Sequence, residues 1–389
     1  MQIEEVMSKP LKTLIWHWGR RGGGPRYTLE LARVLATRQD MEIYLSLSRQ
    51  SEIYADFECV QSAGRFDINT YEGILQFGLR SIRLPMLKRR FARYIREQKI
   101  DVVFCTMDHL WGAFLVSAIR DSDAVYLLTV HDATRHPGED QGQRRWLLRR
   151  DINASDSALV LTRSVGLSLQ ANYSYPADRV FLSAHGHFGD GSVNVEVRSL
   201  PTDRPVRLLF FGRILQYKGL DLMLEVLPLL RREFPGLQLE VWGNGDINPY
   251  QSAIEAVGGV RVENRWIEES EIPQIFASTD LGMLPYREAS QSGVVATAFA
   301  LGMPCVATPV PGLCEQISDG VTGIISNGFG AAEYAEAVAR VLRDPVLYTR
   351  LSQNCITVTK TTLSWDCIGQ SVVDALRGAY AKGKRGKEN

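Results

Sequence analysis

Residues 206–245 read VRLLFFGRILQYKGLDLMLEVLPLLRREFPGLQLEVWGNG, and this stretch contains a complete strand–loop–helix–strand unit. Residues 206–211 form a nearly continuous apolar run, as expected of a strand that is covered on both faces. Apolar side chains then recur at helical spacing, at Leu220, Met223, Leu224 and Leu227. Pro235-Gly236 ends the predicted helix, and residues 237–241 alternate as the next strand. The stretch therefore predicts an open α/β sheet.

The loop between the first strand and the helix carries two glycines and two cations. Gly212 and Gly219 let the backbone turn tightly and approach a ligand. Arg213 and Lys218 lie between a strand's carboxyl end and a helix start, where open α/β sheets bind anions. A planar guanidinium and an ammonium can together neutralise a diphosphate without a metal. The alternative is that both cations only solvate a surface loop, but the glycines and the flanking elements favour the anion site.

This unit resembles the C-terminal domain of the family-four retaining glycosyltransferases, which have the GT-B fold. In that family an F-x-G-R-x-x-x-x-K-G loop holds the diphosphate of the donor. Every position of the motif is filled here, by Phe210 or Phe211, Gly212, Arg213, Lys218 and Gly219. The resemblance implies an α/β protein of two Rossmann-like domains, whose parallel sheets face one another across a cleft. It also implies transfer of a sugar from a UDP- or GDP-linked donor to an acceptor hydroxyl with retention, without a metal or a resident cofactor.

The composition is that of an ordinary globular enzyme. The chain has 389 residues, of which 45% are hydrophobic and 23% charged, and its formal net charge is zero. No global field attracts nucleic acid, so we expect no nucleic-acid partner. The six cysteines are scattered without a metal-ligand pattern, which suits a reducing cytoplasm. No apolar run reaches signal-peptide or bilayer-spanning length, so we expect a cytoplasmic protein, at most peripheral at the inner face of the plasma membrane.

The chain is long enough for two domains with a linker between them. The segment 189–205 is polar, contains glycine and proline, and has no apolar periodicity. The expected organisation is an acceptor-binding domain over 1–190, a linker over 191–205, a nucleotide-sugar-binding domain over 206–364 and a C-terminal segment over 365–389. The resemblance implies that a helix over 365–380 crosses back to the first domain, and the charged tail 382–389 is expected to be disordered.

The first domain is predicted to contain strands over 11–16, 41–47, 101–105, 124–130, 157–161 and 180–182. Gly22, Gly23 and Gly24 follow the first strand and expose backbone N–H groups at the start of a helix. They do not form G-x-G-x-x-G, so dinucleotide binding is weakly supported. The resemblance implies that this loop leans over the cleft between donor and acceptor.

His131-Asp132 follows the strand 124–130 at its carboxyl end. A lone histidine is more often structural than catalytic, but the resemblance implies that His131 contacts the donor sugar and that Asp132 lies in the cleft. Asp121-Ser122-Asp123 matches a metal–diphosphate pattern of other glycosyltransferases. It precedes its strand and is therefore interpreted as a turn.

Residues 80–99, RSIRLPMLKRRFARYIREQK, are strongly basic, with Leu87, Phe91 and Ile95 at four-residue spacing. One interpretation is a core-facing helix with a solvated basic side. The other is a basic amphipathic surface that rests on anionic lipid or attracts a phosphate-bearing acceptor. Both interpretations remain open from the sequence, and the acceptor is expected to be sugar- or lipid-linked.

The second domain is predicted to continue with strands over 261–267, 281–284 and 304–307, and with helices over 273–278, 293–301 and 331–343. The resemblance implies that the turn before the helix at Gly293 meets the donor, aided by the helix dipole. The residues that it assigns to donor binding are Gly212, Gly243, Gly245, Ile267, Glu288, Ser290, Gln291, Ser292, Gly293, Val294, Thr297 and Glu315.

The sequence departs from the family pattern at two glutamates, one near the transferred sugar and one that grips the ribose hydroxyls. Ala289 and Thr297 stand at these positions. Glu288 could serve the first with a small shift, whereas Thr297 cannot accept both ribose hydroxyls as a carboxylate does. The missing glutamates leave open a catalytically inactive GT-B protein that binds a nucleotide sugar as a scaffold. A GT-B epimerase stays open as a second alternative, because it shares the architecture.

Overall fold

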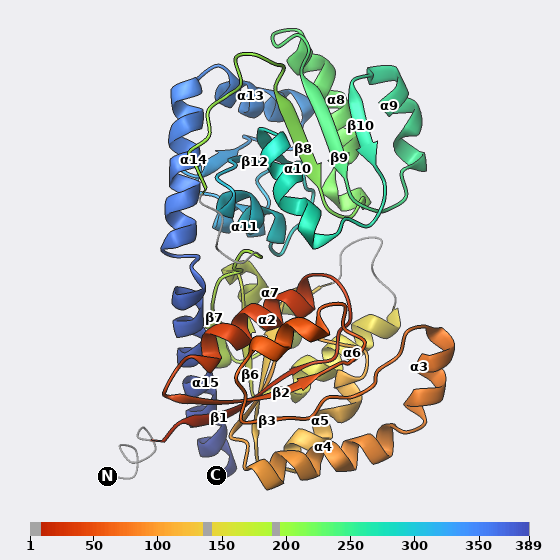
Figure 1. Cartoon of the computed structure of the whole chain (residues 1–389), viewed down its shortest axis with the longest axis vertical. Coiled ribbons are helices and arrows are strands. Elements are labelled where there is room, and N and C mark those ends of the chain that lie inside the picture. Colours follow the sequence, from red (N-terminus) through yellow and green to blue (C-terminus); the bar gives the residue numbers. More distant parts are fainter. Residues whose placement is uncertain (1–8, 135–141, 189–194, 389) are drawn as a thin grey trace. The chain divides into compact units, whose positions relative to one another are not determined.

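The computed structural model describes residues 9–134, 142–188 and 195–388, which divide into two α/β units (Figure 1). Unit 1 contains the described residues up to 184 together with 365–388, and unit 2 contains 185–188 and 195–364. The chain passes between the units after Ala184 and again after Ser364. Each unit is built on a parallel sheet, which confirms the expected pair of Rossmann-like domains.

Among its described residues, unit 1 forms a seven-stranded parallel sheet in the order β3-β2-β1-β4-β5-β6-β7. The strands are β1 (Leu11–His17), β2 (Met41–Leu47), β3 (Gly64–Arg65), β4 (Val102–Cys105), β5 (Val125–Val130), β6 (Ser157–Val160) and β7 (Val180–Leu182). The helices of unit 1 are α2 (Gly23–Ala36), α3 (Ile74–Ser81), α4 (Leu84–Gln98), α5 (Gly112–Arg120), α6 (Gly142–Ala154), α7 (Arg163–Tyr173) and α15 (Trp365–Glu388).

Two layers of helices cover the sheet of unit 1, because alternate strand residues point to opposite faces. Leu14, Trp16 and Val103 belong to a core shared with α4, α5, α6 and α7. Helices α2 and α15 pack on each other and on the strands, with α2 against β1 and β2 and α15 against β5 (Figure 1). Several α15 side chains are buried there, Val372 and Leu376 completely.

Among its described residues, unit 2 forms a six-stranded parallel sheet in the order β10-β9-β8-β11-β12-β13. The strands are β8 (Arg207–Phe211), β9 (Gln238–Trp242), β10 (Val260–Glu263), β11 (Leu281–Leu284), β12 (Cys305–Ala307) and β13 (Gly323–Ile325). The helices are α8 (Leu220–Arg231), α9 (Gln251–Val257), α10 (Ile272–Ser278), α11 (Gly293–Ala300), α12 (Pro311–Gln316), α13 (Ala331–Leu342) and α14 (Pro345–Lys360). One core joins the strands to α8 and α13, and a second joins them to α10, α11 and α12.

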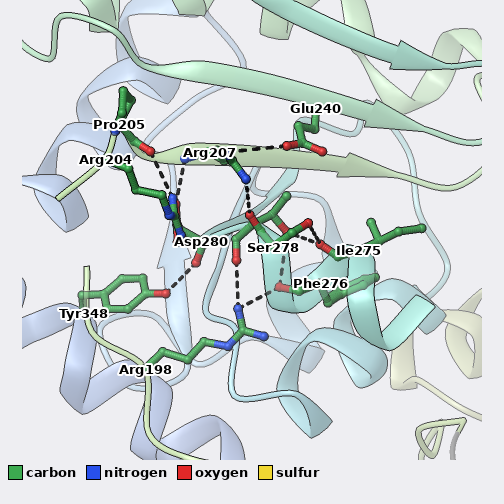
Figure 2. A network of polar contacts seen from close by, with 11 residues as sticks. Arg198, Arg204, Pro205, Arg207, Glu240, Ile275, Phe276, Ser278, Asp280 and Tyr348 are labelled. Atoms are coloured by element: carbon green, nitrogen blue, oxygen red, sulfur yellow. Dashed lines mark hydrogen bonds and ion pairs between the residues drawn. The ribbon is translucent and has the colours of Figure 1, made fainter. Parts of the chain in front are cut away.

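A polar network fastens the segment that leads into β8 to the body of unit 2 (Figure 2). The Arg198 guanidinium donates to the carbonyl oxygens of Leu301, Phe276 and Thr279 at distances of 2.7–2.9 Å. Arg204 forms two hydrogen bonds with the Asp280 carboxylate, at 2.7 and 2.8 Å. Arg198 thus binds carbonyl groups at the carboxyl ends of α10 and α11, groups that a helix leaves unsatisfied.

The structure corrects three of the sequence predictions. The basic stretch 80–99 is not one helix, since α3 ends at Ser81 and α4 begins at Leu84, with Pro85 in its first turn. The predicted strand 261–267 ends at Glu263, where the edge strand β10 leaves its neighbour β9. The tail is helical through Glu388 rather than disordered. Residues 191–194 of the predicted linker, and Asn389, lie outside the described residues.

Candidate functional site

The candidate donor site lies where the strand order of unit 2 reverses. Strand β8 pairs with β9 on one side and with β11 on the other. The loops that follow β8 and β11 therefore leave the same edge of the sheet in opposite directions. Open α/β sheets bind their ligands at such a reversal, outside the carboxyl ends of the strands. The β8 loop comprises residues 212–219, and the β11 loop comprises residues 285–292.

Glycine brings these two loops into direct contact. Gly219 has a φ of 71°, in the left-handed region, and immediately precedes α8. A Cβ atom at Gly219 would lie 2.0 Å from the carbonyl oxygen of Pro285, so no other residue fits without moving the β11 loop. In addition, the backbone N–H of Arg287 donates to the carbonyl oxygen of Tyr217 at 2.7 Å. The two loops thus form one surface.

Gly243 and Gly245 hold the β9 loop against the β8 loop. A Cβ atom at Gly243 would lie 1.9 Å from the carbonyl oxygen of Gly212, and one at Gly245 would lie 2.3 Å from that of Ile214. The N–H of Ile214 donates to the carbonyl oxygen of Asn244 at 2.8 Å. These two predicted donor residues therefore have a clear structural role, which is to let the backbones of the β8 and β9 loops approach closely.

The ammonium of Lys218 is positioned by Tyr286, a residue that the sequence analysis did not identify. The Lys218 ammonium donates to the Tyr286 hydroxyl at 2.9 Å and lies 4.4 Å from the centre of its ring. Tyr286 is only 2% exposed, and burial raises the pKa of its hydroxyl, which therefore stays neutral. A Cβ atom at Gly212 would be 3.4 Å from the Lys218 Nζ and 3.8 Å from Val294. The structure thus brings Gly212, Lys218 and Val294 together, and the signal for Tyr286 was its place directly after a buried strand.

The second predicted cation, Arg213, is exposed and follows Gly212 in the β8 loop. Glu288 is also exposed, in the β11 loop. The neighbouring Arg287 is not available as a third phosphate ligand in this state, because its guanidinium pairs with Asp221 at 2.5 and 3.2 Å. This ion pair joins the β11 loop to the first turn of α8.

Gln316, at the end of α12, fixes the turn before α11. Its Oε1 accepts from the N–H of Ser292 at 2.7 Å, and its Nε2 donates to the carbonyl oxygen of Ser292 at 3.2 Å. Gly312 lies under the same turn, where a Cβ atom would be 2.4 Å from the carbonyl oxygen of Ala289 and 2.5 Å from that of Ser290. The turn with Gln291 is therefore positioned by α12, and Gln316 is a second residue that the sequence reasoning missed.

The remaining predicted donor residues occupy different surroundings. Gly293 begins α11, and a Cβ atom there would lie 3.4 Å from the His185 ring, whose Nδ1 is 2.7 Å from the carbonyl oxygen of Gly186. Thr297 is half-buried on α11, and Glu315 is exposed on α12. Ile267 packs against the core that contains α10 and α11.

The remaining predicted site residues belong to unit 1. His131 is buried after β5, and its Nε2 donates to the carbonyl oxygen of Thr106 at 2.9 Å. Burial lowers the pKa of His131, so its ring is neutral at pH 7, and half-buried Asp132 follows it. Asp121-Ser122-Asp123 forms a turn before β5, as predicted.

The sequence predicts that the triple glycine exposes its backbone N–H groups. In the structure, one of these groups has an intramolecular partner. The N–H of Gly22 donates to the Glu52 carboxylate at 2.9 Å, and Gly23 and Gly24 already belong to the first turn of α2. The intramolecular carboxylate occupies the donor that a free glycine turn would have offered to a ligand. Only the Gly22 donor therefore departs from the expectation, because a helix leaves the N–H groups of its first turn without intrahelical partners.

Comparison with known proteins independently supports assignment of the chain to a glycosyltransferase family. The profile of "Glycosyltransferase Family 4" matches residues 21–186, and that of "Glycosyl transferases group 1" matches residues 205–344. An alpha-D-kanosaminyltransferase of Streptomyces kanamyceticus is 27% identical over 285 residues, which cover 70% of this chain and 72% of that protein. A D-inositol 3-phosphate glycosyltransferase of Paenarthrobacter aurescens is 28% identical over 277 residues, covering 68% and 67%.

Solved structures share the fold. HepE of Anabaena in complex with UDP superposes with a TM-score of 0.72 at 15% identity, covering 94% of this chain and all of that one. Sucrose-phosphate synthase of Thermosynechococcus elongatus superposes with a TM-score of 0.69 at 17% identity, covering 96% and 99%. With both family profiles matched in order along two parallel-sheet domains, the chain belongs to the group 1, family-four glycosyltransferases of the GT-B fold.

Proposed function

We propose that the protein transfers a sugar from a UDP- or GDP-linked donor to a sugar- or lipid-linked acceptor hydroxyl, with retention at the anomeric carbon. The observation that carries this proposal is the ammonium of Lys218, placed by Tyr286 in a glycine loop at the strand reversal of unit 2. Arg213 lies in the same loop. HepE, which shares the fold, has been crystallised with UDP and with UDP-glucose, and this favours a nucleotide-sugar donor here.

The proposed role of the β8 loop is to stabilise the nucleoside diphosphate as it leaves the sugar. Negative charge grows on the β-phosphate as the bond to the sugar breaks, and Arg213 and Lys218 would neutralise it. In a same-face substitution the departing phosphate takes the acceptor proton, so no protein base is needed. By analogy with oxyanion donors, removing either cation would raise the barrier by about 2.7–4 kcal/mol. Two cations in this position are also what a metal-independent transferase requires.

Unit 1 is proposed to bind the acceptor, and a surface of α3 and α4 is proposed to contact anionic lipid. Residues 73–99 contain eight arginines and lysines against the single acid Glu97. Several large apolar side chains on the same segment are exposed, namely Leu75 (85%), Leu79 (68%), Ile82 (75%) and Met86 (56%). Apolar residues between cations are typical of a helix that lies in a membrane interface. None of the helices in the described ranges is both long and apolar enough to cross a bilayer.

Product analysis tests the reaction. Purified protein is incubated with a panel of nucleotide sugars and with candidate acceptors, with and without EDTA, and the anomeric coupling constant of the product is measured by proton NMR. The proposal predicts a retained configuration, activity in EDTA and a loss of roughly 100-fold or more in Arg213→Ala or Lys218→Ala. An inverted product would contradict the proposal, as would single variants as active as the wild type. Arg232→Ala is the control, because this arginine is exposed in the same unit.

One specific observation favours a second candidate function. Ala289 and Thr297 stand where the family has glutamates, so the protein could bind nucleotide sugars as a catalytically inactive scaffold. Saturable binding of a nucleotide sugar, with neither transfer nor epimerisation of it over the acceptor panel, would favour that function.

A further inference from the structure

The segment that follows the crossing after Ala184 contacts α11 at both of its ends. Its described residues are 185–188 and 195–206, and they belong to unit 2. Helix α11 has eight residues and is therefore about 12 Å long. Residues 290–294, which we call the donor turn, include the start of this helix and belong to the candidate donor site. A segment that fixes both ends of α11 also fixes the donor turn.

His185 contacts the N-terminal end of α11. A Cβ atom at Gly293 would lie 3.4 Å from Cε1 and 3.5 Å from Nε2 of the His185 ring. The Cα–Cβ bond of a helical residue is tilted toward the helix N-terminus, so the ring lies beside the start of α11. Its Nδ1 donates to the carbonyl oxygen of Gly186 at 2.7 Å, and its centre lies 5.3 Å from that of the Phe188 ring. With these contacts and an exposure of 8%, the ring is a fixed support for Gly293.

Arg198 binds the C-terminal end of α11. Its Nε donates to the carbonyl oxygen of Leu301, the residue that caps this helix, at 2.7 Å. Its Nη1 donates to the carbonyl oxygens of Phe276 and Thr279, at the end of α10, both at 2.9 Å (Figure 2). One planar guanidinium thus ties the ends of two helices together, and its positive charge faces the negative end of both helix dipoles.

The segment around Arg198 is itself anchored to α14. The N–H of Arg198 donates to Oγ of Ser352 at 2.8 Å. Gly302, just after α11, has a φ of 65°, and a Cβ atom there would lie 3.2 Å from Cγ1 of Val195 and 3.2 Å from Cδ1 of Ile356. Only glycine adopts this conformation readily, and it lets the segment, the end of α11 and α14 meet at one point. The hold on the end of α11 therefore has a firm base.

We propose that His185 and Arg198, together the α11 clamp, are positioning residues of the donor turn that set the place of α11 along its axis. A helix N-terminus binds anions through the N–H groups of its first turn, which here belong to Gly293 and Val294. A shift of about 1 Å would take these groups out of hydrogen-bonding distance of a phosphate oxygen. Gln316 fixes the turn before the helix, and the clamp fixes the helix itself. The inference rests on the proposed function for the identity of the ligand, whereas the clamp does not depend on it.

Hydrogen exchange of the full chain tests the clamp without any ligand. Arg198→Lys keeps the charge but lacks the planar fork that reaches the ends of both helices. We expect the amides of residues 290–296, at the other end of α11, to exchange faster than in the wild type. Arg204→Lys is the matched control, because it removes paired hydrogen bonds of the same segment, to Asp280 before β11. Equal exchange of residues 290–296 in the two variants would overturn the inference.

Titration of UDP and GDP measures the consequence for the donor site. We expect the dissociation constant of the nucleotide to rise roughly tenfold in Arg198→Lys and in His185→Ala, and to stay unchanged in Arg204→Lys. Both clamp residues act through one helix, so the double variant should lose less affinity than the product of the two single effects. Because coupling between two sites is reciprocal, bound nucleotide should slow exchange of residues 195–200 in the wild type.

The outcomes separate this inference from the proposed function. A wild-type protein that binds neither nucleotide would contradict the proposed function alone, because the exchange experiment needs no ligand. Nucleotide binding with equal affinity in Arg198→Lys and Arg204→Lys would overturn the clamp alone. A merely structural role of Arg198 would lower the melting temperature of both arginine variants and leave their nucleotide affinities equal.

Discussion

Gly219 has a φ of 71°, and a Cβ atom there would lie 2.0 Å from the carbonyl oxygen of Pro285. Gly320 has the same φ of 71°, but a Cβ atom there would meet only the Arg340 guanidinium, at an ordinary contact distance of 3.5 Å. Gly320→Ala therefore bears only the cost of a positive φ, about 1–2 kcal/mol. Gly219→Ala must in addition push the β11 loop away from the β8 loop. We predict a clearly larger fall in melting temperature for Gly219→Ala, together with loss of UDP binding, both measured by thermal shift. Equal effects of the two variants would contradict the close contact of the loops.

Tyr286→Phe isolates one hydrogen bond, because the ring, its burial and its contact with the ammonium are kept. A hydrogen bond of this kind contributes about 0.5–1.5 kcal/mol. We predict that the dissociation constant for UDP rises roughly threefold to tenfold, because Lys218 loses the group that positions it. Tyr250→Phe, at a half-buried tyrosine of the same unit, is the control. Unchanged affinity in isothermal titration would show that Tyr286 does not position Lys218.

Asp151 gives a prediction on pH. Its pKa is about 7 in the folded protein and 3.8 in the unfolded chain, so between about pH 4 and 7 the folded state binds more protons. Its contribution to the free energy of unfolding therefore falls as pH rises through this window and is constant above it. Asp151→Asn should stabilise the protein at pH 8 relative to pH 5, whereas exposed Asp246→Asn should not. Urea unfolding at both pH values measures the difference, and parallel pH profiles of wild type and Asp151→Asn would contradict the burial of a carboxyl group.

Sequence spacing predicts individual residues of the site only where the contact is local. The glycines and cations of residues 212–219 lie within one loop, so their pattern is visible along the chain. The contact of Lys218 with Tyr286 spans 68 residues, and that of Ser292 with Gln316 spans 24. These pairs depend on how β11 and α12 are placed in the folded unit, which no single-sequence period encodes.

At the scale of elements, the exposed apolar face of α3 and α4 makes a prediction about membranes. Leu79→Glu with Ile82→Glu places acids on this face without touching the buried Phe91 and Ile95 that anchor α4. We predict that wild-type protein floats with phosphatidylserine vesicles at low salt and that the variant stays in solution. Val346→Glu, at an exposed apolar residue of unit 2, is the control. Wild-type protein that fails to float would remove lipid from the proposed partners.

Buried strands were the most predictable elements, because short apolar runs bounded by glycine, proline or polar turns mark them. The break between α3 and α4 was missed because Ser81-Ile82-Arg83 contains no helix breaker, although Pro85 marks the start of α4. The strand after Gly259 was predicted too long, because the apolar pair Trp266-Ile267 follows shortly after β10 has left the sheet at Glu263. Local pattern thus fixes the presence of an element more firmly than its ends.

At the scale of the whole molecule, the candidate donor site lies at the strand reversal of unit 2, and the α11 clamp belongs to the same unit. The alternation of strands and helices along the sequence predicts the two sheets. The clamp could not be predicted, because Arg198 and Leu301 are 103 residues apart and meet only in the folded unit.

The most direct test of the account is thermal stabilisation by nucleotide diphosphates and nucleotide sugars. A ligand at one hundred times its dissociation constant adds about 2.7 kcal/mol to the free energy of unfolding, which is readily measured. We predict that UDP or GDP and one corresponding nucleotide sugar stabilise the wild type, and that Arg213→Ala with Lys218→Ala abolishes the shift. The control pair Arg232→Ala with Lys360→Ala, at exposed cations of the same unit, should keep it. No shift of the wild type with any nucleotide, or an undiminished shift in the double variant of the β8 loop, would contradict the donor site described here.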